Sequence, residues 1–198
     1  MKNYKWNTEK FSGDVSVVLF TSRNKDNKDV EGFTQRRKAF ITTEPLGDKT
    51  LKEFQHFVDD GVDGEVSRMY YSVNTRDAVK VNKLLVHYLI DNPNTNPAAL
   101  MGKVAAIAAQ KDCASSKHWM FDFDCFDIAK VEEFKQDILA IDPTVFIDIT
   151  PTYHNFAVVV DHGFDTRKLL EKWGDVVELK KDDLLFVTSG KKIQEVKL

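Results

Sequence analysis

Short apolar runs and amphipathic stretches alternate through the first part of the chain. The β-branched runs VSVVLFTSR (residues 15–23) and KAFITTE (38–44) indicate two strands separated by a polar loop. Apolar residues then recur at helical spacing from Leu51 until Gly61, a residue type favoured just past a helix end. The segment EVSRMYYSVN (65–74) follows and predicts a third strand.

Two consecutive helices are expected next, as a helical insert near residues 77–111. Asp77 is a suitable N-cap for an amphipathic helix that runs to about residue 90. The pair Asn96-Pro97 is typical of a helix start and opens an alanine-rich segment. Together these signals separate the first strands from those in the second half of the chain.

The second half resumes the alternation of strands and helices. WMFDFDCF (119–126) indicates a strand, residues 128–140 a helix, and residues 144–160 two strands joined by a short turn. A last helix is expected at residues 165–174 and a last strand at 184–189. This order predicts an α+β fold with a mixed, mainly antiparallel sheet and helices on one face, as in RRM-like domains.

Length and composition favour one domain over residues 1–198. Hydrophobic residues make up 42% and charged residues 30%, and no Pro/Gly/Ser-rich linker divides the chain. No apolar run is long enough for a membrane helix, and the first ten residues lack a secretory signal, so a cytoplasmic protein is expected. Cys113 and Cys125 have no metal-site spacing.

The charge balance restricts the contacts that the protein can make with nucleic acid. A net charge of −3 argues against coating a polyanion through bulk positive charge. Small basic clusters occur at residues 36–38, 180–181 and 191–192, where solvated surface is the simplest interpretation. Any contact with a polyanion should therefore be local.

Alternation along the strand WMFDFDCF separates its side chains into two sets. Phe121 and Phe123 share the aromatic side, which is expected in the core, whereas Asp122 and Asp124 share the opposite side. The same alternation in residues 67–74 gives one apolar and one polar side. The polar sides are expected to remain accessible to solvent.

A sheet with helices on one face would gather these polar side chains on its open face. The expected members of this face are Arg68, Asn74, Asp122, Asp124, Asp148 and His154. Two carboxylates spaced i, i+2 on a strand can share divalent ions, because Mg²⁺ and Mn²⁺ prefer oxygen ligands. Asp122 and Asp124 are thus candidate metal ligands; the alternative is a solvated strand face.

These motifs resemble the catalytic core of the archaeo-eukaryotic primase (primase-polymerase) superfamily. That family has a hydrophobic-Asp-hydrophobic-Asp strand followed by a small-x-His motif, and MFDFD and TYH are similar to them. The segment MYYSVNTRD, with Asn74 and Arg76, resembles an Asn-x-Arg pattern of some phage and plasmid members. Most of the chain also looks like proteins of tailed phages.

The resemblance implies a primase-core-like fold and roles for individual residues. It implies that Asp122 and Asp124 are catalytic and bind Mg²⁺ or Mn²⁺, and that His154 contacts the nucleotide. Asn74 and Arg76, from the similar Asn-x-Arg pattern, and Arg68, from its place on the polar face, are further nucleotide-binding candidates. The family also has a hydrophobic-Asp strand after the histidine. In this chain the late strand DDLLFVTS has its acids ahead of it, which leaves Asp161 and Asp148 as imperfect substitutes, and Asp148 is taken as the third catalytic acid.

The expected function is that of a metal-dependent nucleotidyltransferase acting on nucleoside triphosphates and single-stranded nucleic acid. Replication or host proteins are the expected partners, in the host cytoplasm if the protein is phage-encoded. One alternative is a non-catalytic phage accessory protein that binds nucleotide, nucleic acid or a host protein on the same face. Another is a metal-dependent nuclease.

Overall fold

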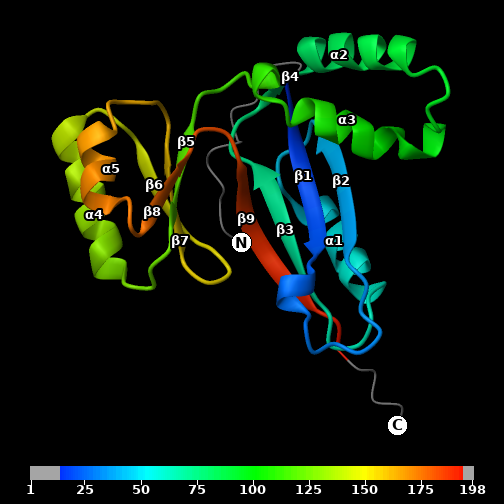
Figure 1. The fold of residues 1–198 in the computed structure, drawn as a ribbon, viewed down its shortest axis with the longest axis horizontal. Helices are drawn as coiled ribbons and strands as arrows, with labels where there is room; N and C mark the ends of the chain where they lie inside the picture. Colours follow the sequence, from blue (N-terminus) through cyan, green and yellow to red (C-terminus); the bar gives the residue numbers. More distant parts are fainter. Residues whose placement is uncertain (1–13, 194–198) are drawn as a thin grey trace.

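The computed structural model, which describes residues 14–193, confirms the predicted α+β class but divides the strands between two antiparallel sheets (Figure 1). The first sheet has the order β2-β1-β3-β9 and comprises β1 (Asp14–Ser22), β2 (Arg36–Thr42), β3 (Val66–Ser72) and β9 (Leu184–Lys191), with the short β4 (Arg76–Asp77) paired to β1. The second has the order β6-β7-β5-β8 and comprises β5 (Trp119–Phe123), β6 (Ile147–Pro151), β7 (Phe156–Val160) and β8 (Val177–Lys180).

Helices cover both faces of the first sheet, so the prediction of helices on one face is wrong for it. Helix α1 (Asp48–Asp59) buries Phe54 against Phe20 and Met69 on one face. Helices α2 (Ala78–Asp91) and α3 (Leu100–Ala108) form the predicted helical insert and cover part of the opposite face around Val17. The short 3₁₀ helices are Asn24–Asp26, Pro97–Ala99 and Lys111–Cys113.

The second sheet has its helices on one face only, as predicted. Its element order, β5-α4-β6-β7-α5-β8, and its strand order give the βαββαβ arrangement of RRM-like and ferredoxin-like domains. Helices α4 (Ile128–Ile141) and α5 (Arg167–Trp173) bury Phe121 and Phe123 completely. The predicted aromatic core side of β5 is therefore confirmed.

The other face of the second sheet is covered at one end by the first sheet. Met120 and Val159 are buried there with Leu185 of β9 and with Val73, which directly follows β3, and Figure 1 shows β5 to β8 lying beside β9. Met120 lies on the side of β5 that the sequence predicted to be open. A second sheet covers this side because Val73, Met120 and Leu185 remove apolar surface from water together.

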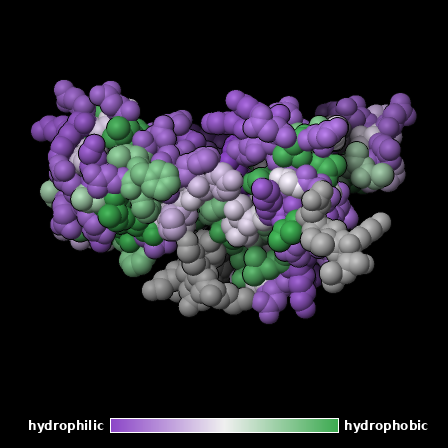
Figure 2. All heavy atoms as spheres, turned by 90° about the horizontal axis from the view of Figure 1, so that it is seen from below, coloured by the Kyte–Doolittle hydropathy of each residue, from purple (hydrophilic) through white to green (hydrophobic). Residues whose placement is uncertain are grey.

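The surface seen from below is mostly hydrophilic, with smaller hydrophobic areas between the two ends of the molecule (Figure 2). None of the helices within residues 14–193 combines the length and the apolar character that crossing a bilayer requires.

Candidate functional site

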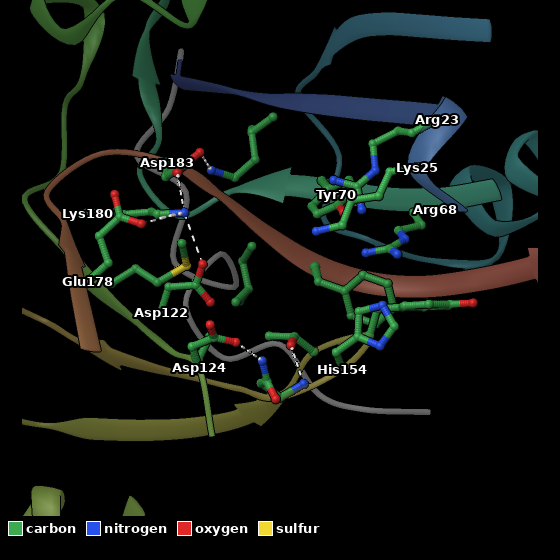
Figure 3. A pocket seen from close by; sticks show the side chains of 18 of the residues that line it. Arg23, Lys25, Arg68, Tyr70, Asp122, Asp124, His154, Glu178, Lys180 and Asp183 are labelled. Atoms are coloured by element: carbon green, nitrogen blue, oxygen red, sulfur yellow. Dashed lines mark hydrogen bonds and ion pairs between the residues drawn. The ribbon is translucent and has the colours of Figure 1, made fainter. Parts of the chain in front are cut away.

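A cleft of about 890 Å³ lies where the two sheets separate (Figure 3). One wall comes from β1, β2 and β3, and the other from β5, β8 and the start of β9. The turn between β6 and β7, residues 152–155, lines it as well. The size is within the range of small-molecule and cofactor sites, about 300–1,000 Å³.

The wall formed by the first sheet is cationic. Strand register places Arg37, Thr21 and Arg68 in one row across β2, β1 and β3, on the same face as Val17 but beyond the part that α2 and α3 cover. Arg23 and Lys25 follow at the end of β1. Four cationic side chains therefore line this wall, which makes it attractive to an anion.

Arg68 is the most enclosed of these cations. Only 6% of its side chain is exposed, and its guanidinium forms an ion pair with Asp26 and stacks 3.7 Å from the ring centre of Tyr153. Asp26 also accepts a 3.0 Å hydrogen bond from Arg23. Within the part of the chain that the structure describes, the buried Nε of Arg68 has no hydrogen-bond partner, so this group retains capacity for a ligand.

The opposite wall is acidic and is centred on Asp122. Its carboxylates are Asp122, Asp124, Asp175, Glu178 and Asp183. Glu178 of β8 pairs directly with Asp122 of β5, so both side chains point to the same face. The cleft therefore has one cationic and one anionic wall.

Lys180 lies within the acidic wall. Its Nζ donates a 3.0 Å hydrogen bond to Asp122 Oδ2 and lies 3.6 Å from Glu178 Oε2 and 3.7 Å from Asp183 Oδ2. Burial alone would lower the pKa of Lys180, but the hydrogen bond to Asp122 and the negative charges of the three carboxylates raise it overall. The side chain is therefore an ammonium cation at neutral pH.

Asp124 lies just beyond the end of β5 and points away from Lys180. Its Oδ1 accepts a 2.6 Å hydrogen bond from Asn155 Nδ2, and its backbone N–H donates to Val176 O at 2.8 Å. Figure 3 shows Asp122 and Asp124 side by side at the cleft, each with a different donor. Strand alternation alone does not produce this divergence, because β5 ends at Phe123.

His154 and Tyr153 belong to the turn before β7. His154 is exposed at the cleft, and its ring packs edge-on against Tyr153 with centroids 4.6 Å apart. The prediction that His154 shares the cleft with Asp122, Asp124 and Arg68 is therefore confirmed. Its position is set by the turn rather than by strand alternation, since β7 begins at Phe156.

The prediction that Asn74 and Arg76 belong to the site is wrong, because neither residue lines the cleft. Asn74 is 1% exposed and bonds to His118 and Asp182, and Arg76, 2% exposed, donates to Asp182 Oδ2 at 2.7 Å. Arg68, also predicted on an open face, is buried as well, although it reaches the cleft. Asn74 and Arg76 are enclosed because the segments before β5 and β9 pack on the end of β3, whereas Arg68 is enclosed by Asp26 and Tyr153.

Asp148 is the remaining predicted catalytic residue, and it does not line the cleft either. It pairs with Val159, which pairs with Met120, so β7 separates it from β5 and its register is two residues away from Asp122. With strands about 4.8 Å apart, the backbones of β6 and β5 are about 10 Å apart. Asp148 is therefore too far from Asp122 to serve as the third catalytic acid unless β6 moves towards β5.

The residues have the chemistry that a divalent ion requires, but their side chains do not converge. Carboxylate oxygens are the ligands that Mg²⁺ and Mn²⁺ prefer, and Asp122, Asp124 and Glu178 lie on or beside neighbouring strands. Within residues 14–193 no group of three or more His, Cys, Asp or Glu side chains is arranged to hold an ion. Lys180 and Asn155 already hold Asp122 and Asp124.

Sequence reasoning missed Glu178 and most of the cationic wall. The alternation of Val177, Glu178 and Leu179 is a signal for a short strand with an outward acid, and it follows the histidine as the family resemblance implies. Arg37 and Lys180 belong to small basic clusters that read as solvated surface. Only the pairing of β8 with β5 and of β2 with β1 brings them to the cleft.

No protein-family model matches the sequence, and no curated protein is detectably similar to it. The resemblance to primase-polymerases therefore stays a prediction that depends on the motifs and on the geometry of the cleft.

Proposed function

We propose that the cleft binds a nucleoside triphosphate together with Mg²⁺ or Mn²⁺, and that the protein is a primase-polymerase-like nucleotidyltransferase acting on single-stranded nucleic acid. The observation that carries the proposal is the charge separation across one cleft: carboxylates around Asp122 face cations around Arg68. A metal-nucleotide complex has matching charges, since its cation suits the carboxylates and its phosphates suit the cations.

Each wall has a defined part in this proposal. Asp122, Asp124 and Glu178 would hold the metal, which when bound neutralises phosphate oxygens in the transferring group. Arg68 is suited to a phosphate because its buried guanidinium is already oriented by Asp26 and Tyr153.

At the edge of the cleft, His154 could donate a hydrogen bond to the triphosphate from its exposed position. Glu178 takes the place that the sequence prediction gave to Asp148. In nucleotidyl transfer the 3′ hydroxyl of the growing strand would lose its proton to water, its oxygen would bond to the α-phosphorus, and the bond from the α-phosphorus to pyrophosphate would break. Under this proposal the protein acts in the cytoplasm, that of a host cell if it is phage-encoded, with replication or host proteins that open the duplex.

One observation favours a second candidate, a non-catalytic accessory protein that binds nucleotide, nucleic acid or a host protein in this cleft. Asp122 and Asp124 are held by Lys180 and Asn155 and do not converge. A binding protein requires only the cationic wall, whereas a nucleotidyltransferase requires the carboxylates to be released.

A primer-extension experiment distinguishes the candidates. The protein is incubated with single-stranded template, labelled nucleotides and Mn²⁺, and the products are separated on a denaturing gel. Extension or primer synthesis that is lost in Asp122→Asn supports the proposal, with Asp91→Asn, an exposed carboxylate on α2, as the matched control. Template shortening would instead indicate the nuclease. Retained nucleotide binding without any product would favour the accessory protein.

A further inference from the structure

Lys180 is positioned where a cation bound to Asp122 would be. Its backbone pairs with Met120, two residues before Asp122, and its side chain extends along the sheet so that Nζ reaches the carboxylate at 3.0 Å. Glu178 and Asp183 lie within 3.7 Å of the same ammonium. One lysine thus contacts three carboxylates, from β5, from β8 and from the residue just before β9.

The charges of this cluster explain why an ammonium group is favourable at this position. Asp122, Glu178 and Asp183 carry three negative charges in a wall where the lysine side chain is only 27% exposed. Without a cation these carboxylates would repel one another, and Lys180 reduces the net charge of the cluster from −3 to −2. A divalent ion would satisfy the same carboxylates with a larger charge.

We propose that Lys180 is a built-in counterion that competes with divalent metal for Asp122, so that a metal ion binds the cleft by displacing the lysine. This inference rests on the proposed function, because it assumes that Asp122 is a metal ligand. It accounts for the divergence of Asp122 and Asp124, since Asp122 is drawn towards β8 by the ammonium while Asp124 is bonded to Asn155. Until metal arrives, the lysine partly neutralises the carboxylates and holds Asp122 in place.

The test compares Mn²⁺ affinities of the whole protein, measured from the electron paramagnetic resonance signal of free Mn²⁺ without any nucleotide. Removing a neighbouring cation changes ionic equilibria by about one to three powers of ten, so Lys180→Met should bind Mn²⁺ at least about tenfold more tightly than wild type. Lys180→Gln is the second variant if the methionine protein does not fold. Lys180→Arg retains the charge and should stay near wild type.

Lys181→Met is the matched control. The ammonium of Lys181 lies 4.6 Å from the ring centre of Trp119, and the residue does not line the cleft. Lys181→Met therefore changes the net charge of the protein as Lys180→Met does, but outside the cleft. Tighter binding in Lys180→Met but not in Lys181→Met, abolished by adding Asp122→Asn, supports the inference.

Three other outcomes would overturn it in different ways. Equal affinities in wild type and Lys180→Met, with binding lost in Asp122→Asn, would retain the metal site of the proposed function and refute the competition by lysine. No Mn²⁺ binding to either protein would refute the metal site and, with it, the counterion. Weaker binding in Lys180→Met would mean that the lysine assists the metal, which also contradicts the inference.

Discussion

Replacing Asn74 by alanine should destabilise the fold without removing a ligand contact. The carboxamide lies at the end of β3 and is 1% exposed. Its Oδ1 accepts hydrogen bonds from the His118 backbone N–H at 2.7 Å and from Ser116 Oγ at 2.9 Å. Its Nδ2 donates to His118 O and to Asp182 Oδ1, each at 3.1 Å. Asn74 therefore joins β3 to the segments that precede β5 and β9.

The magnitude follows from these four bonds. A buried intramolecular hydrogen bond contributes about 0.5–1.5 kcal/mol net, and a buried donor or acceptor that is left without a partner costs about 1–3 kcal/mol. Because the partners of Asn74 belong to one network, the losses are not fully additive. We expect Asn74→Ala to lower the free energy of unfolding by about 2–4 kcal/mol, which for a protein of this size is a fall in Tm of about 5–15 °C.

Urea denaturation followed by circular dichroism measures this free energy directly. Asn94→Ala, at an exposed turn position, is the matched control and should change stability by less than about 0.5 kcal/mol. Nucleotide affinity per folded molecule should stay unchanged in Asn74→Ala. A variant as stable as wild type but with weakened nucleotide binding would refute the structural role and return Asn74 to the binding site.

Two further predictions concern the core and the pH dependence of stability. Phe123→Ala should lower the free energy of unfolding by about 3–5 kcal/mol because the ring is fully buried, whereas His154→Ala should barely change it; the reverse order in urea denaturation would contradict the face assignment. Hydrogen bonds from Thr144 and His162 lower the pKa of Asp142 to about 2, and the bond to Asp142 raises the pKa of His162, so their mutual stabilisation is complete between about pH 4 and 6.5. This stabilisation is lost as the pH rises through the raised pKa of His162 or falls towards 2. The difference in unfolding free energy between wild type and His162→Gln should therefore be present at pH 5 and absent by pH 9. A difference that does not depend on pH would contradict this prediction.

The faces of individual strands could be predicted from the sequence because alternation is a local property. Phe121 and Phe123 are buried against α4 and α5 as expected, and Asp122 reaches the cleft. Alternation does not reveal which element covers the other side of a strand. Met120 and Asn74 are buried on sides predicted to be open, because contacts between segments distant in sequence enclose them.

The composition of the site depended on pairings that no local pattern encodes. Glu178 joins Asp122 only because β8 pairs with β5, which brings together two residues 56 positions apart in the sequence, and the strand itself has four residues. Arg37 joins Arg68 through their common neighbour Thr21. Asp148 has the expected residue type on a strand of the same sheet, but β7 lies between it and Asp122.

The most direct test of the central claim is the thermal stability of the protein with Mn²⁺ and a nucleoside triphosphate added together. A ligand that binds only the folded state stabilises it by mass action and so raises Tm. At a ligand concentration of a hundred times Kd, the free energy of unfolding increases by about 2.7 kcal/mol. We expect wild type and the control Asp91→Asn/Asp112→Asn, which alters two exposed carboxylates outside the cleft, to show this rise. Asp122→Asn/Asp124→Asn should show none. An equal rise in Asp122→Asn/Asp124→Asn, or no rise in wild type, would contradict the account.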